Sequence, residues 1–335
     1  MSIKKKNLPW VEKFRPRHLE DLKFQDDILN TINKSINNRN FPHLLLYGPP
    51  GSGKTTCALA ICLKLYGPKM LSSRVLELNA SDERGIKVVR EKVKNYAKLA
   101  LSIPPKKYNF PCPKFKIIIL DEADAMTTDS QFALRRIIEK YSSSTRFCLI
   151  CNYENKIIPA IKSRCAEFKF NSISDKDMKE RLKFVSNSEN IKIKNEIIET
   201  ISKISKGDLR KAINLLQTVS LCDANKVSSK ICYSVSGFPN PKEIATIINT
   251  LLDPKLDFNT SLTKIKKIVH ENGYSVSLIL KEISENIIIK IKNNELSGSK
   301  FIKIFSEIAK LENQVVKSTF GDIYLSSLIS IFKTE

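Results

Sequence analysis

The pattern of apolar and polar positions changes character near residue 172 of this 335-residue chain. Between residues 41 and 170, short apolar runs rich in Ile, Leu and Val alternate with stretches of helical spacing. That alternation predicts an α/β fold, with a parallel sheet covered by helices on both faces. The expected strands lie at 43–47, 74–78, 116–120, 146–151 and 166–170. The expected helices lie at 54–66, 85–100, 129–140 and 156–162.

Beyond residue 172 the apolar spacing is helical throughout. A compact helical set covers 174–236, and the proline-containing stretch 238–241 predicts a hinge. Amphipathic helices follow to the end of the chain. We therefore expect three domains: an α/β core at 1–171, a small helical domain at 172–237 and an all-α domain at 238–335.

A glycine-rich stretch between the first expected strand and helix matches the P-loop pattern G-x-x-x-x-G-K-[ST]. Its residues are Gly48, Pro49, Pro50, Gly51, Ser52, Gly53, Lys54 and Thr55. Glycines let consecutive backbone N–H groups converge on a phosphate, and the following helix directs its positive dipole end there. Lys54 supplies charge for the β- and γ-phosphates, the Thr55 hydroxyl is a candidate Mg²⁺ ligand, and Thr56 lies beside the nucleotide.

A second element favours a nucleotide site over a chance glycine-rich turn. The apolar run 115–120 predicts a central strand buried on both faces, and it ends in Asp121 and Glu122. Asp121 fits the Walker-B role of holding Mg²⁺, directly or through water, and Glu122 is placed to polarise a water against the γ-phosphate. The alternative is an acidic strand end that caps the next helix. Asp124 is expected to be a capping or structural acid.

The charge balance favours a polyanionic partner, because 56 Lys and Arg face 35 Asp and Glu, a formal net charge of +21. Nucleic acid is the first candidate, and a lysine-rich compositional bias is the alternative. We find no signal peptide and no apolar run approaching a membrane span, so no membrane partner is expected. Eight scattered cysteines predict reduced core thiols. Cys148 and Cys151 should point to opposite faces of one strand, which disfavours a shared metal.

Further segments carry a family resemblance. They are residues 9–16, 48–55, 77–86, 120–124, 133–139, 151–153, 163–165 and 207–212. Together they span 8–218, about two thirds of the chain, and they make the sequence similar to the small subunits of replication factor C, an AAA+ clamp loader. Details at 74–77 and 147–152 resemble most the eukaryotic subunit four of the human-type naming. The resemblance implies an AAA+ core, a helical lid and a C-terminal collar for oligomerisation.

The resemblance also implies roles for residues outside the P-loop. Val11, Arg15 and Pro16 match the segment that closes over the adenine. Asn152 matches the residue that orients the attacking water, although an Asn at a strand end is often a turn former. Arg210 matches the arginine that reaches the γ-phosphate of its own nucleotide, and the alternative is a solvated helix arginine.

Arg164 matches the family's arginine finger, which acts in trans on ATP held by the neighbouring subunit. An obligate oligomer follows, because without a neighbour this arginine would have no phosphate to reach. Arg84, Lys87 and Arg90 lie near a helix start and match positions that track the DNA backbone without reading sequence. A solvated basic helix face is the alternative. The roles of Arg135 and Arg136 stay open among helix packing, interface contact and coupling to Glu122.

We therefore expect an ATPase that uses ATP and Mg²⁺ as a subunit of a hetero-pentameric clamp loader. It would open a ring-shaped sliding clamp, proliferating cell nuclear antigen, and load it on primer–template DNA in the nucleus. One alternative is a scaffold subunit that binds nucleotide and donates Arg164 without hydrolysing ATP. Another is a different DNA-directed AAA+ motor, such as a branch-migration motor, which segments 9–16 and 163–165 argue against.

Overall fold

The computed structural model describes residues 8–22, 25–37, 41–80, 86–105, 107–191, 193–222, 228–293, 298–315 and 321–333. The chain divides into two compact units. The first contains Met1–Lys192 and Ser205–Gln217, and the second contains Ile193–Ile204 and Thr218–Glu335. The three-domain division expected from the sequence stays a prediction, because this partition cuts the chain at other points.

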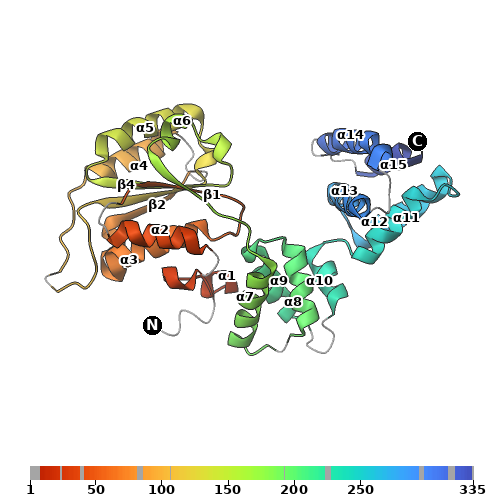
Figure 1. The fold of residues 1–335 in the computed structure, drawn as a ribbon, viewed down its shortest axis with the longest axis horizontal. Coiled ribbons are helices and arrows are strands. Elements are labelled where there is room, and N and C mark those ends of the chain that lie inside the picture. The colour runs from red at the N-terminus through yellow and green to blue at the C-terminus, as the bar shows by residue number, and fades with distance from the viewer. Residues whose placement is uncertain are drawn as a thin grey trace. The chain divides into compact units, whose positions relative to one another are not determined.

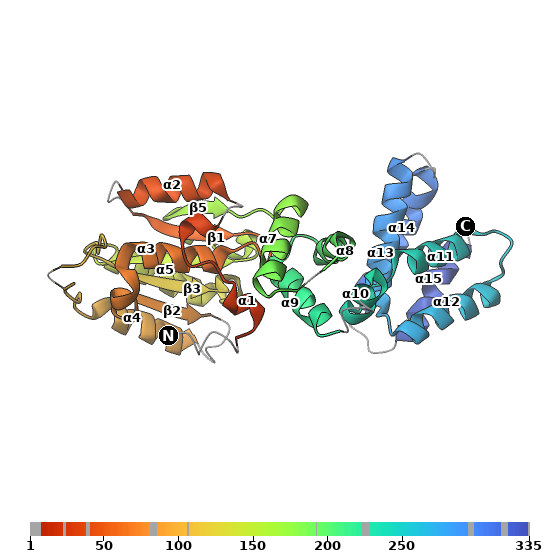
Figure 2. The same ribbon diagram turned by 90° about the horizontal axis from the view of Figure 1, so that it is seen from below.

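The first unit is built on a parallel five-stranded sheet, which confirms the α/β class. Its strands are β1 (His43–Tyr47), β2 (Val75–Asn79), β3 (Lys116–Asp121), β4 (Thr145–Cys151) and β5 (Cys165–Lys169). The order β2-β3-β4-β1-β5 places β2 and β5 at opposite edges, as Figure 2 shows. The carboxyl ends of β1, β3 and β4 therefore lie side by side in the middle of one sheet edge, where open α/β sheets bind ligands.

Helices cover both faces of this sheet (Figure 1). On one face α2 (Asp26–Asn37) and α3 (Lys54–Arg74) pack against the side chains of alternate strand positions, including Leu44, Ile117 and Cys148. On the other, α4 (Ile86–Lys98), α5 (Thr128–Tyr141) and α6 (Pro159–Lys162) pack against a set that includes Ile118 and Cys151. Cys148 and Cys151 thus belong to different cores, as strand alternation predicted.

Two helix predictions miss one end of the observed helix by three residues or more, and the other two are within two residues. The expected helix at 54–66 ends where Gly67 takes φ 62°, but a second helical segment continues from Pro68 to Arg74, so α3 is longer. The expected helix at 156–162 is shorter: a 3-10 turn, Glu154–Lys156, precedes α6. Pro159 explains the late start, because its fixed φ suits the first position of a helix while its missing N–H would break the interior.

The remaining elements are mostly helical. Short turns α1 (Trp10–Lys13) and η2 (Leu19–Asp21) precede the sheet, η3 (Ala123–Ala125) follows β3, and α7 (Asp175–Ser188) follows β5. Next come α8 (Asn195–Ser205), α9 (Leu209–Ser220) and α10 (Ser229–Ser236). The C-terminal helices are α11 (Pro241–Leu252), α12 (Phe258–Asn272), α13 (Val276–Lys292), α14 (Gly298–Val315) and α15 (Gly321–Lys333).

These last helices enclose an apolar core of their own, with Ile247, Ile283 and Leu325 fully buried. The N-termini of α11 and α12 are capped by side chains: Asn240 accepts from Lys242 N, and Asp257 from Thr260 N. Such caps satisfy backbone donors that the first turn leaves unpaired. None of the helices in the described ranges combines the length and apolar character needed to cross a bilayer.

Candidate nucleotide site

The P-loop joins β1 to α3 through glycines in conformations that other residues rarely adopt. Gly48, Gly51 and Gly53 have φ 141°, 69° and 95°. Gly51 is further constrained because a Cβ there would lie 1.9 Å from Oδ1 of Asp208, the residue before α9. The glycines therefore permit both the loop's curvature and the close approach of α9.

Lys54, the first residue of α3, is only 7% exposed and connects the loop to the end of β4. Its Nζ donates to the carbonyl oxygens of Gly48 and Pro49, each at 2.8 Å, and to Oδ1 of Asn152 at 3.0 Å. Burial lowers the pKa of Lys54, and the nearby carboxylate of Asp121 opposes that shift. The ammonium is thus held at the loop by neutral oxygens.

Asp121, at the end of β3, meets the loop from the other side. The Thr55 hydroxyl donates to Oδ2 of Asp121 at 2.7 Å, and the backbone N–H of Glu122 donates to Oδ1 at 2.9 Å. A hydroxyl and a carboxylate are the hard oxygen donors that Mg²⁺ takes, usually with phosphate and water completing the shell. The described residues contain no cluster of three or more His, Cys, Asp or Glu side chains that could hold a metal ion.

Glu122 is a non-glycine residue in the left-handed region, with φ 53° and ψ 40°. Its side chain is exposed and lines the same cavity as Lys54 and Thr55. Such a backbone costs roughly 1–3 kcal/mol and is found mainly at functional sites. Asp124 accepts from the N–H groups of Asn152 and Tyr153, both at 3.2 Å, which fits the structural role expected for this acid.

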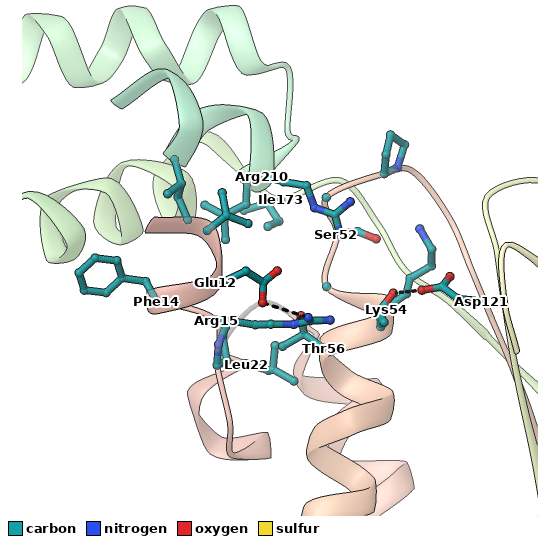
Figure 3. A pocket seen from close by; sticks show the side chains of 18 of the residues that line it. Glu12, Phe14, Arg15, Leu22, Ser52, Lys54, Thr56, Asp121, Ile173 and Arg210 are labelled. Atoms are coloured by element: carbon teal, nitrogen blue, oxygen red, sulfur yellow. Dashed lines mark hydrogen bonds and ion pairs between the residues drawn. The ribbon is translucent and has the colours of Figure 1, made fainter. Parts of the chain in front are cut away.

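The cavity holding these groups has a volume of about 170 Å³ and lies wholly within the first unit (Figure 3). Sequence-predicted residues that line it are Val11, Arg15, Pro16, Pro50, Gly51, Ser52, Gly53, Lys54, Thr55, Thr56, Asp121, Glu122, Asn152 and Arg210. Gly48 and Pro49 do not line it, and they contribute the carbonyls that hold Lys54. Arg210 extends from α9 toward Ser52, as Figure 3 shows.

One end of the cavity is apolar. Sequence reasoning missed the apolar residues Phe14, Leu22, Ile173, Leu209 and Ile213, which join Val11 and Pro16 there. Leu209 and Ile213 lie in α9, and Phe14, Leu22 and Ile173 lie between elements. An apolar residue at such a position is not distinguishable from ordinary core by its spacing alone, so no sequence signal marks these residues. The N-terminal segment is anchored by Trp10 N–H, which donates to Oε1 of Gln217 at 3.0 Å.

Arg15 lines the same cavity. Its Nε donates to Oγ1 of Thr56 at 3.3 Å, and its Nη1 donates to Oε2 of Glu12 at 3.3 Å (Figure 3). The guanidinium is therefore tied to the first turn of α3. Such a planar cation can hydrogen-bond or stack on a base.

Arg164 is not part of this cavity. It follows α6, where its Nη2 lies 2.5 Å from Oε1 of Glu139 on α5. Arg84 lies outside the described residues, and Lys87 and Arg90 fall in the first turns of α4, where only the backbone is described. Arg135 pairs with Glu139 on the same helix at 3.0 Å, and the roles of Arg135 and Arg136 stay open.

Three family models match the chain in sequence order. The model described as "ATPase family associated with various cellular activities (AAA)" covers residues 44–172. A "RCF1/5-like, AAA+ ATPase lid domain" covers 180–221, and the "Replication factor C C-terminal domain" covers 239–330.

Similar proteins agree with these matches. The chain is 44% identical to replication factor C subunit 2 of Saccharomyces cerevisiae over 83% of its length and 80% of that protein. It is 42% identical to human replication factor C subunit 5 over 99% of its length and 93% of that protein. Human and Arabidopsis thaliana subunits 4 are 40% and 41% identical, so the identities do not separate the subunit numbers.

Among solved structures, a point variant of RuvB from Thermotoga maritima aligns with a TM-score of 0.53. The alignment covers 78% of this chain and 86% of that one at 17% identity, so the likeness concerns the fold alone.

Sheet, P-loop and acidic strand end together define an AAA+ ATPase, a class that binds nucleotide with a divalent metal. The chain is also more than 40% identical to replication factor C subunits across most of its length, which narrows the assignment from this class to one family. The chain belongs to the replication factor C family, the AAA+ clamp loaders. Resemblance to this family's small subunits is thereby confirmed, while subunit four stays a prediction.

Proposed function

We propose that this chain binds and hydrolyses ATP, with Mg²⁺, as one subunit of a hetero-pentameric clamp loader. One observation carries the proposal: the chemistry-bearing residues from β1–α3, β3 and β4 form one connected set. Lys54 bonds Asn152, and Thr55 bonds Asp121, whose neighbour Glu122 faces the same cavity. A scaffold subunit that only binds nucleotide would not require the strained Glu122 backbone or the Lys54–Asn152 bond.

Within this set each side chain has a role. Val11, Pro16 and Arg15 enclose the base, and Lys54 with the loop N–H groups binds the phosphates. Thr55 and Asp121 would hold Mg²⁺, which supplies charge neutralisation at the phosphates. Glu122 accepts a proton from the attacking water, Asn152 orients that water, and Arg210 contacts the γ-phosphate from α9.

The proposed partners are other subunits of the same loader, a ring-shaped sliding clamp (proliferating cell nuclear antigen) and primer–template DNA. Support comes from the relatives named as subunits of replication factor C and from the net charge of +21. Arg164 would act on nucleotide in the neighbouring subunit, because it lies outside the cavity of its own chain. A nuclear location follows from this role in replication.

The test is to purify the chain with its native partners and measure loading of a ring clamp onto primed circular DNA. Loading should require ATP and should fail with a non-hydrolysable analogue at the stage where the loader is released. Loading that proceeds equally well with Glu122→Gln in this subunit would support the scaffold alternative. Branch migration of four-way junctions without clamp loading would support a different DNA motor.

A further inference from the structure

Arg164 is held by its own subunit at two places. Its Nη1 donates to the carbonyl oxygen of Ala160 at 2.6 Å, four residues earlier in α6, and to Oγ of Ser163 at 3.3 Å. Its Nη2 lies 2.5 Å from Oε1 of Glu139, in the last turn of α5. These contacts fix the guanidinium between two helices, although the side chain is still 33% exposed.

Glu139 is itself restrained. The same Oε1 accepts from Nε of Arg135 at 3.0 Å, one turn earlier on α5. The hydrogen bond from Arg135 and the charges of Arg135 and Arg164 lower the pKa of Glu139, so its carboxylate stays ionised at neutral pH. Arg135 thus fixes the rotamer of the carboxylate that Arg164 contacts.

The contacts leave part of the guanidinium available. An arginine has five N–H donors, in a planar fork that can bind two oxygens of one phosphate. Among the described residues, Nη1 of Arg164 donates to Ala160 and Ser163, and Nη2 forms the ion pair with Glu139. The Nε–H, on the edge of the fork that Nε shares with one terminal nitrogen, makes no hydrogen bond or ion pair with a described residue, and the side chain reaches the surface.

We propose that Glu139 is a positioning residue for Arg164, holding the fork so that its remaining edge is presented to phosphate in the neighbouring subunit. This inference rests on the proposed trans role of Arg164. A long arginine side chain has many rotamers, and ordering it on contact with phosphate costs entropy. The Glu139 carboxylate orders it beforehand, which raises turnover at the neighbour without adding affinity for ATP.

The test uses the complex assembled with native partners and compares wild type, Arg164→Ala, Glu139→Gln and the double variant. The turnover lost in Arg164→Ala defines the Arg164-dependent part of ATP hydrolysis. Glu139→Gln keeps the size of the side chain but removes its charge. We expect it to lower the Arg164-dependent kcat about threefold to fivefold, the size that one exposed ion pair supports, with KM unchanged. In the Arg164→Ala background it should have no further effect.

Lys140→Gln is the matched control, because it changes one exposed charge in the same turn of α5. It should leave kcat unchanged. If Glu139→Gln leaves kcat at the wild-type value while Arg164→Ala lowers it, the positioning role is wrong and the trans role stands. An equal loss from Glu139→Gln in both backgrounds also overturns the positioning role. No loss from Arg164→Ala overturns the trans role and this inference together.

Discussion

The hydroxyl of Thr55 donates a 2.7 Å hydrogen bond to Oδ2 of Asp121, a residue 66 positions later in the chain. The bond joins the start of α3 to the end of β3, and both oxygens are suited to a hard divalent cation. We therefore expect Asp121→Asn to raise the Mg²⁺ concentration needed for half-maximal ATP binding by at least about tenfold. Titration of a fluorescent ATP analogue at varied Mg²⁺ measures this. Asp129→Asn, an exposed acid on α5, is the control and should not shift the midpoint.

Glu122→Gln should separate binding from hydrolysis. The amide keeps the shape of the side chain but cannot accept the proton of the attacking water, and general-base catalysis contributes about 10²–10⁴-fold. Hydrolysis at this site within the assembled complex should fall by that order, while ATP affinity is retained.

Lys54→Ala should instead lose both hydrolysis and ATP affinity, because the Lys54 ammonium binds the phosphates. Radiolabelled ATP hydrolysis and nucleotide binding, measured side by side, check both outcomes, and undiminished turnover in Glu122→Gln would sink the hydrolytic role.

Gly51→Ala should lower stability and ATP affinity by more than the backbone strain of an alanine at positive φ would cause. Its φ is 69°, and the added Cβ would lie 1.9 Å from the Asp208 carboxylate and 3.0 Å from its Cα. Gly273→Ala is a matched control, because Gly273 has φ 65° but nothing within 4 Å of its Cβ position. We expect the control to cost about 1–2 kcal/mol of stability and no ATP affinity. Gly51→Ala should lower both the melting temperature and ATP affinity, and equal effects of the two variants would contradict the contact.

His43 should make stability depend on pH. Its Nδ1 accepts from the backbone N–H of Phe147 at 3.1 Å, and burial, assisted by Arg146, lowers the pKa of His43 to about 4. The unfolded state, with a pKa near 6.5, then binds the proton more readily than the folded state. The contribution of His43 to the free energy of unfolding is therefore complete above about pH 6.5, and it is lost as the pH falls toward 4.

The variant His43→Asn tests this, because the Asn side-chain oxygen can accept the same bond without titrating. We expect the free energy of unfolding of wild type, from urea denaturation at about pH 4.5 and 7.5, to fall more on acidification than that of the variant. Equal falls in both proteins would show that His43 does not titrate as described.

The expected DNA contacts give a prediction about salt. Lys87→Ala and Arg90→Ala, in the first turns of α4, should weaken binding of the assembled loader to all primer–template sequences alike. Each should also make the salt dependence of log K shallower by about one unit. Lys94→Ala, an exposed cation further along α4, is the control and should change neither quantity. A loss confined to particular sequences would contradict backbone recognition.

Local sequence patterns were sufficient for the strands and for the phosphate-binding loop. Apolar runs placed the five strands to within about a residue. The signal was clearest for the central strands β1, β3 and β4, because a strand buried on both faces must be apolar over most of its length. The spacing of Gly48, Gly51 and Gly53 identified the loop because backbone at positive φ strongly favours glycine. The helix ends near Gly67 and Pro159 were harder to predict from the sequence. A helical segment can continue past a glycine or begin only at a later proline, and local spacing does not say which.

The sequence by itself thus determined the class of fold, the loop and the acidic strand end, since each is encoded in consecutive residues. Only the tertiary structure decided which distant groups meet. The strand order β2-β3-β4-β1-β5 brings Asn152 to Lys54 and Asp121 to Thr55, and no periodicity encodes that order. The packing of α5 against α6 likewise pairs Arg164 with Glu139. The physical reason is that contacts between chemistry-bearing side chains depend on how crossovers stack the strands, which local propensity does not specify.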